Sequence, residues 1–307
     1  MNERERKLQL PEILGVPKKG IIFSDLDGVW FDEKANFASP PPEDLAIIQE
    51  AKEAGYWVVL NSDTGASPLA RYSQELGCSP LVIAENGMVT YAPSAGIKEF
   101  FVPIKSLFDE FKTDAAAILA SQSNSIIIMG DATAIVREDP IIPYKNSTVF
   151  LINDMRECSF GVYVRSTNQL GKMDTDTELT NQIKIMLDKL TRNAMTKWSS
   201  SNVLLACKSY PEVGSCLVRD PRVYKAKAVA RMIAQFSEPL DYYMIGDSLG
   251  DAMDFPSVGS RVTTCAVGNA DPRLKEIVTR TGGIVAPEDS RISKGANYII
   301  QNILQIG

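Results

Sequence analysis

Two aspartates, Asp25 and Asp27, lie two residues apart directly after the short apolar stretch 20–24. An extended backbone sends alternate side chains to the same side, so these two carboxylates face the same way. At a separation of 4 Å and an effective dielectric of 20, they repel each other by about 4 kcal/mol. A bound cation would remove the repulsion, whereas the alternative interpretation is a polar turn that ends a buried strand.

A second acidic segment favours the metal site over the turn. Asp247 and Asp251 follow another apolar stretch, residues 241–245, in which we expect a strand. The chain contains no histidine, so imidazole ligands and imidazole general bases are excluded. A site of carboxylate oxygens suits Mg²⁺, which keeps several water ligands and takes others from substrate phosphate. We therefore predict a magnesium site whose contributors are Asp25, Asp27, Asp247 and Asp251.

Lys225 is the residue that we expect to balance the negative charge. It begins an expected helix, and the amides at a helix N-terminus also attract anions. Lys227 is the rival, two positions along and on another face of the helix. A solvated surface lysine is the alternative interpretation for both.

The elements that must position these residues alternate between strands and helices. Two strand–helix pairs and a third strand between residues 20 and 84 indicate a parallel sheet covered on both faces. Residues 92–209 differ, because two amphipathic helices and several successive strands there suggest a separate α+β module. We predict an α/β fold with a doubly wound, Rossmann-like parallel core sheet, made of residues 1–91 and 210–307, and an inserted α+β domain at 92–209.

The segments described above occur in the order of the motifs of the haloacid dehalogenase-like superfamily, and the chain resembles that family. The resemblance extends to residues 84–87 and 267–270, which are similar to the Cof-type sugar-phosphatase branch. It covers residues 20–90 and 212–300. The inserted module resembles the large α/β cap of that branch only in position, size and order of elements.

The resemblance implies a mechanism. Asp25 would attack phosphorus and form an aspartyl phosphate, which is a carboxylate form of covalent catalysis. Asp27 would protonate the leaving oxygen and then activate water. Mg²⁺ would be held by Asp25, the Asp27 carbonyl and Asp247, while Lys225 and a hydroxyl group hold the transferring oxygens. Asp251 would orient metal-bound water or Lys225.

The loop after the second strand departs from the family pattern. Relatives often carry Thr-Gly-Arg there, whereas this chain reads Asn-Ser-Asp-Thr-Gly at residues 61–65. By its distance from the strand, we predict Ser62 as the phosphate-binding hydroxyl, with Thr64 as the alternative and Asn61 as a third possibility. The inserted cap would close over the site and select the substrate. The candidate substrate contacts that the resemblance adds are Thr64, Asn86 and Asn269.

Composition limits the partners and the compartment. Lys and Arg total 32 against 38 Asp and Glu, and this net charge of −6 argues against nucleic acid and anionic membranes as partners. No stretch approaches the roughly 18 apolar residues that a membrane span needs. The five cysteines are odd in number and far apart, which is typical of reduced thiols. We expect a cytoplasmic protein.

These observations predict a magnesium-dependent phosphatase that hydrolyses a small phosphorylated metabolite, a sugar phosphate or glycosyl phosphate, through an aspartyl phosphate. One alternative is a phosphomutase, which would use the same chemistry and return the phosphoryl group to the substrate. The other is a non-catalytic protein that binds sugar phosphates or accepts a phosphoryl group.

Overall fold

The computed structural model describes residues 10–31, 40–101, 105–199, 203–253 and 261–306. The chain divides into two units: unit 1 is Met1–Phe101 with Val223–Gly307, and unit 2 is Val102–Arg222. Within the described ranges, no helix combines the length and apolar character that crossing a membrane requires.

The unit boundaries lie further along the chain than the predicted ones at 91/92 and 209/210. Strands β4 (Val89–Ala92) and β5 (Ile97–Phe100) pair antiparallel at the edge of the unit 1 sheet, so the first boundary moves beyond them. Strand β11 (Ser215–Arg219) pairs within the unit 2 sheet, so the second boundary moves as well.

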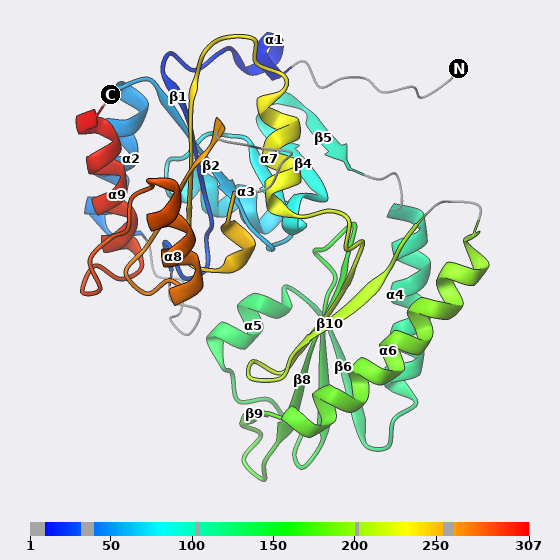
Figure 1. Ribbon diagram of the computed structural model, residues 1–307. Coiled ribbons are helices and arrows are strands. Elements are labelled where there is room, and N and C mark those ends of the chain that lie inside the picture. Colours follow the sequence, from blue (N-terminus) through cyan, green and yellow to red (C-terminus); the bar gives the residue numbers. More distant parts are fainter. Residues whose placement is uncertain (1–9, 32–39, 102–104, 200–202, 254–260, 307) are drawn as a thin grey trace. The chain divides into compact units, whose positions relative to one another are not determined.

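Unit 1 is built on a seven-stranded sheet with the order β13-β12-β1-β2-β3-β4-β5 (Figure 1). The neighbours from β13 to β3 pair in parallel. The apolar run of β1 is buried at every position, as expected for a parallel strand between two helical layers. The bounds of these strands are β1 Gly20–Ser24, β2 Tyr56–Asn61, β3 Val82–Ala84, β12 Asp241–Gly246 and β13 Thr263–Ala266.

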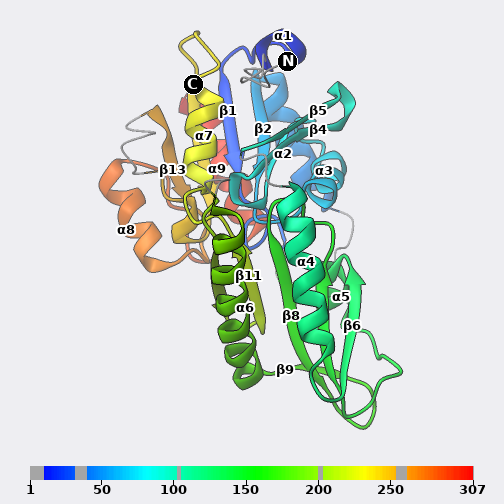
Figure 2. The same ribbon diagram turned by 90° about the vertical axis from the view of Figure 1, so that its right-hand side faces the viewer.

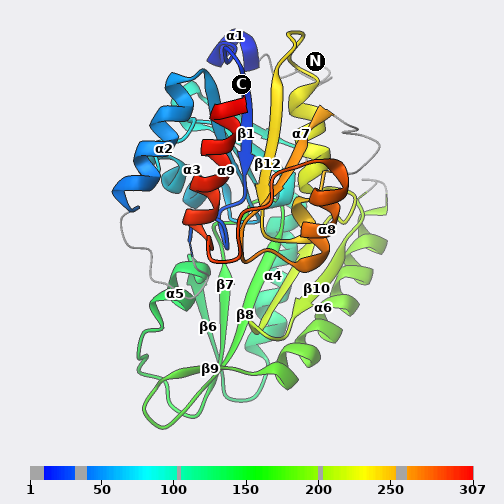
Figure 3. The same ribbon diagram turned by 60° about the vertical axis from the view of Figure 1, so that its left-hand side comes forward.

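Helices cover both faces of this sheet (Figures 1 and 3). On one face, Ala226 and Val229 of α7 (Lys225–Ile233) belong to the same buried cluster as Phe23 and Val59 of the sheet. On the opposite face, α2 (Pro42–Glu53) and α9 (Ser293–Ile306) pack side by side. The other helices of unit 1 are α1 Leu10–Leu14, α3 Ala66–Glu75 and α8 Pro272–Thr281, with short 3₁₀ turns η1 Glu85–Gly87, η2 Pro93–Ala95 and η4 Leu249–Asp251.

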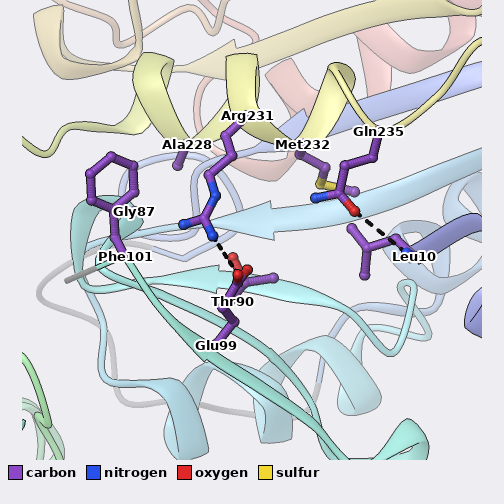
Figure 4. Close-up of a pocket in the computed structure, with 9 residues that line it drawn as sticks. All are labelled: Leu10, Gly87, Thr90, Glu99, Phe101, Ala228, Arg231, Met232 and Gln235. Carbon is purple, nitrogen blue, oxygen red and sulfur yellow. Dashed lines mark hydrogen bonds and ion pairs between the residues drawn. The ribbon is translucent and has the colours of Figure 1, made fainter. Parts of the chain in front are cut away.

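Helix α7 also holds the end of β5 (Figure 4). Phe101, the last residue of unit 1 before unit 2, has the Lys227 ammonium 5.1 Å and the Arg231 guanidinium 5.3 Å from its ring centre. Arg231 also forms an ion pair with Glu99 of β5, and these residues line a small pocket beside α7. Because α7 begins just after Val223, both points where the chain leaves unit 1 adjoin this helix.

Unit 2 is a mixed sheet with the order β10-β11-β8-β7-β6, and β9 pairs with β8. Helices α4 and α6 cover one face (Figure 2), where Phe111 of α4 meets Phe160 of β8 at a centroid distance of 5.6 Å. Helix α5 packs on the other face. The predicted fold class, an α/β fold with a doubly wound core sheet and an inserted α+β domain, is confirmed, and the sheet of the inserted domain is mixed. The bounds in unit 2 are α4 Lys105–Ala120, β6 Ser125–Gly130, α5 Ala132–Glu138, β7 Thr148–Asn153, β8 Phe160–Thr167, β9 Met173–Thr175, α6 Thr177–Lys197 and β10 Ala206–Tyr210.

Candidate active site

The two acidic segments lie at the same edge of the core sheet. Strands β1 and β12 pair in parallel, with Ser24 opposite Ile245, and the Asp25 amide continues the ladder by donating to the Ile245 carbonyl at 2.9 Å. Parallel neighbours end at a common edge, where open α/β sheets bind ligands. The segments that begin with Asp25 and Asp247 therefore leave the sheet side by side.

Asp25 is a buried carboxylate with both oxygens engaged. Its Oδ1 accepts a hydrogen bond from the Leu26 amide at 2.8 Å, and its Oδ2 lies 2.7 Å from Lys225 Nζ. Lys225 is the first residue of α7 and is itself buried, and its ammonium also donates to Asp251 Oδ1 at 2.6 Å. The structure thus brings Asp25, Lys225 and Asp251 together, while the rival Lys227 lies over Phe101.

Asp251 has its second oxygen fixed by the turn that carries it. Asp251 Oδ2 accepts from the Ser248 amide at 3.1 Å and from the Ser248 hydroxyl at 2.9 Å. The bond from the Ser248 amide is one half of a capping box around the turn η4, and in the other half the Ser248 side chain accepts from the Asp251 backbone amide. The turn η4 therefore fixes the Asp251 side chain through hydrogen bonds of its own. Since both oxygens are used, Asp251 orients Lys225 from a rigid position.

Asp247 approaches the first acidic loop closely at Gly28. Gly28 has φ +74°, a left-handed conformation that favours glycine. A Cβ atom at this position would lie 2.0 Å from Asp247 Oδ2, far inside van der Waals contact. Only glycine leaves room for the Asp247 carboxylate beside this loop.

Burial and the neighbouring opposite charge shift the pKa values of Asp25 and Lys225 in opposite directions. Burial raises the pKa of Asp25 well above its ordinary value of 3.8, Lys225 lowers it, and Asp251 and Asp247 raise it further. Burial by itself lowers the pKa of Lys225, but Asp25 and Asp251 outweigh it and raise this pKa above the ordinary 10.5. Lys225 is therefore held as the ammonium ion between Asp25 and Asp251, and Asp247 is a third acidic group beside them.

The cluster fits a divalent cation. Asp25, Asp247 and Asp251 each offer one carboxylate oxygen, and these oxygens lie within 4.8 Å of one another. Oxygen donors and uncompensated negative charge are what Mg²⁺ requires. Among the described residues this group does not include the Asp27 side chain, and a metal contact through the Asp27 carbonyl stays a prediction.

The loop after β2 is joined to the turn after β3. Ser62 Oγ accepts from the Thr64 amide and donates to Thr64 Oγ1, both at 3.2 Å, so these two hydroxyl groups form one buried pair. Asn86 donates its side-chain amide to Asp63 and its backbone amide to the Ser62 carbonyl at 3.1 Å. Asp63, the residue that departs from the family pattern, is thus the partner of Asn86.

Asn269 lies at the same edge of the sheet, but both polar atoms of its side chain form hydrogen bonds to backbone groups of the protein. Its Nδ2 donates to the Gly28 carbonyl at 2.9 Å, and its Oδ1 accepts from the Ile292 amide at 2.6 Å. Ile292 has φ +54°, which is strained for a β-branched residue. Asn269 therefore ties the Asp25–Gly28 loop to the start of α9.

The fold and the site together define a class: a doubly wound α/β enzyme core with aspartates at two adjacent strand ends, a buried lysine and an inserted second domain. A family model described as haloacid dehalogenase-like hydrolase matches residues 22–285, and the chain belongs to this family. The resemblance stated from the motifs is confirmed, and the protein is a haloacid dehalogenase-like hydrolase. A search of curated proteins found no match.

Several solved structures share the fold. A haloacid dehalogenase-like hydrolase from Bacteroides thetaiotaomicron is 13% identical with a TM-score of 0.60, over 93% of this chain and 100% of that one. The protein TM0651 from Thermotoga maritima is 17% identical with a TM-score of 0.57, over 92% and 97%. A trehalose-6-phosphate phosphatase related protein is 14% identical with a TM-score of 0.57, over 94% and 98%.

Proposed function

We propose that the protein is a magnesium-dependent phosphatase of a small phosphorylated metabolite, with a sugar phosphate or glycosyl phosphate as substrate. The observation that carries the proposal is the buried Asp25 carboxylate, held by Lys225 within a cluster that Asp247 and Asp251 complete. Membership of the hydrolase family supports the reaction type. The fold shared with a trehalose-6-phosphate phosphatase related protein supports the sugar phosphate.

In the first step, a carboxylate oxygen of Asp25 forms a bond to phosphorus as the bond from phosphorus to the ester oxygen breaks. The leaving oxygen takes a proton from the Asp27 carboxyl group. An ammonium group has three N–H donors, and two of those on Lys225 go to Asp25 and Asp251. The third donates to a phosphoryl oxygen, together with one hydroxyl group of the Ser62–Thr64 pair.

In the second step, a water molecule gives a proton to the Asp27 carboxylate and attacks phosphorus. The bond between phosphorus and the Asp25 oxygen breaks, inorganic phosphate leaves and the Asp25 carboxylate is restored. Asp27 thus gives one proton and receives one, so it ends each cycle as it began.

Asp25, Asp247 and the Asp27 carbonyl would hold Mg²⁺. When bound, the ion offsets the negative charge of the cluster and of the phosphoryl group. Asp251 keeps Lys225 in place, and we assign Asn269 a positioning role through Gly28 rather than the substrate contact that the sequence suggested.

The test is phosphate release from a panel of phosphorylated sugars and acids, with Mg²⁺ and with a chelator. We expect Mg²⁺-dependent release that falls at least about 100-fold in Asp25→Asn and Asp27→Asn. Asp289→Asn, an exposed aspartate of unit 1, serves as the control and should keep wild-type activity.

Three results would contradict the proposal. Formation of an isomer without release of phosphate would indicate a phosphomutase. Binding of a sugar phosphate with no turnover, unaffected by Asp27→Asn, would indicate a non-catalytic protein. If no substrate gives phosphate release above the chelator blank, the protein is not a phosphatase of these substrates.

A further inference from the structure

Asn61, the last residue of β2, carries a buried side-chain amide that no described residue satisfies. Its exposed fraction is 0%, and neither Oδ1 nor Nδ2 has a hydrogen-bond partner within the described part of the chain. Buried polar groups are nearly always paired, and leaving one unpaired costs free energy. A group kept unpaired in the free protein is explained when a ligand supplies the partner.

The strand register shows where this amide lies. Strands β1 and β2 lie side by side (Figure 2), and Ser24 is paired with Leu60. Asp25 and Asn61 are the next residues along the two segments, so they share one face of the sheet. Phe23 and Val59, two residues earlier, belong to the buried cluster that includes α7 residues. Asn61 therefore lies beside Asp25 on the face that α7 covers, and Lys225 is the first residue of α7.

The hydroxyl groups of Ser62 and Thr64 do not replace the Asn61 amide as a donor to the phosphoryl group. The Ser62 hydroxyl hydrogen is donated to Thr64 Oγ1 within the loop, whereas the two N–H donors of Asn61 meet no acceptor among the described residues. Asp25 and Asp251 hold the Lys225 ammonium at this edge, and Asp247 is a third carboxylate of the same group, so a phosphoryl group entering the site needs additional neutral donors. An amide supplies such donors without adding charge.

We propose that Asn61 is a further phosphoryl-binding residue, whose Nδ2 donates to an oxygen of the phosphoryl group beside Asp25. The inference rests on the proposed function and adds to it a residue outside the hydroxyl pair. It carries a distinctive consequence: the amide is unfavourable for folding of the free protein and favourable for binding.

The test compares Asn61→Leu with Asn153→Leu. Leucine branches at Cγ as asparagine does and makes no hydrogen bond; it is larger, and the same increase in volume applies to both variants. Asn153 is the matched control, because it also ends a strand, β7, and is buried, but its Nδ2 donates to Thr133 Oγ1 at 3.4 Å and its Oδ1 accepts from the Met155 amide at 3.2 Å. Without ligand, we expect the thermal unfolding midpoint to rise by about 2–4 °C in Asn61→Leu and to fall in Asn153→Leu.

Calorimetry with inorganic phosphate in the presence of Mg²⁺ provides the second measurement. We expect the phosphate Kd to rise at least about tenfold in Asn61→Leu and to stay unchanged in Asn153→Leu. The Kd for Mg²⁺ alone should be equal in wild type and Asn61→Leu, because no metal ligand is changed. Asn61→Ala gives the same comparison in case the leucine variant does not fold.

The outcomes separate this inference from the function on which it rests. If wild-type protein hydrolyses substrate and binds phosphate, and the Asn61 variants bind phosphate equally well, the inference is wrong and the phosphatase proposal stands. If Asn61→Leu lowers the unfolding midpoint as Asn153→Leu does, the amide is satisfied inside the fold and its role is structural. If wild type neither binds phosphate nor releases it, the proposed function fails first.

Discussion

At the scale of single residues, Lys225 is enclosed by two carboxylates, and its charge is what allows them to be buried together. Replacing it by Met leaves Asp25 and Asp251 as unpaired, buried like charges. Breaking a buried ion pair in this way typically costs about 3–5 kcal/mol. We expect Lys225→Met to lower the free energy of unfolding by about that amount, measured by urea denaturation in a chelator so that no cation compensates.

Lys184→Met is the control for Lys225→Met. Lys184 forms a one-turn pair with Asp188 on α6 at 2.5 Å, with side chains 36% and 29% exposed. Pairs of this kind contribute about 0.3–0.5 kcal/mol. Equal losses in the two variants would show that the Lys225 cluster is not the buried charge centre described above.

Residue types and spacing were enough to predict which charged side chains come together, but not which groups the side-chain amides bind. Asp25, Lys225, Asp247 and Asp251 were predicted because charges at strand and helix ends limit where they can lie. The resemblance implies a substrate contact for Asn269, and nothing in the sequence shows that its side chain donates to the carbonyl of Gly28, 241 residues away. A hydrogen-bond partner that distant depends on the completed fold.

At the scale of elements, the loops after β1 and β12 interlock at Gly28 and Asp247. We expect Gly28→Ala to displace the Asp247 carboxylate, to weaken Mg²⁺ binding by about 10–100-fold and to reduce phosphate release accordingly. Calorimetric titration with Mg²⁺ measures the first effect.

Gly77→Ala isolates the backbone contribution. Gly77 has φ +72°, almost the value at Gly28, but a Cβ there would meet nothing within 4 Å. Both variants therefore carry the same backbone strain of about 1 kcal/mol, and only Gly28→Ala moves a carboxylate. If both variants bind Mg²⁺ like wild type, Asp247 has no part in the metal site.

The sequence predicted best those elements that have a clear hydrophobic pattern. The continuous apolar run at β1 predicted a buried strand at the residues where it is found. The β4–β5 hairpin was not predicted, because its strands have four residues each and carry polar residues such as Lys98 and Glu99. Short, half-buried edge strands have no periodicity long enough to detect.

At the scale of the whole molecule, every residue of the cluster belongs to unit 1, and the two units have separate buried clusters. We expect Mg²⁺ with inorganic phosphate to slow amide hydrogen exchange in unit 1, chiefly around residues 25–28 and 246–251. If unit 2 selects the substrate, a complete phosphorylated substrate bound to Asp27→Asn should also protect amides of unit 2. Unchanged exchange throughout unit 2 with a substrate that wild type hydrolyses would contradict its role in selection.

The predicted organisation had the right architecture with displaced boundaries. The change in sequence texture at residue 92 is real, but it falls inside the β4–β5 hairpin that completes the core sheet. Composition reports where a pattern changes, whereas a domain boundary depends on which strands pair.

The attachment of Phe101 to α7 has a consequence for how such a protein can diversify. Because that residue and Val223 adjoin the same helix, the two ends of the inserted segment leave the core close together. Neighbouring ends are what make the insertion of one domain into another tolerable. A segment joined in this way can be exchanged for an unrelated one, or shortened to a plain connector, while the catalytic scaffold keeps its own chain path.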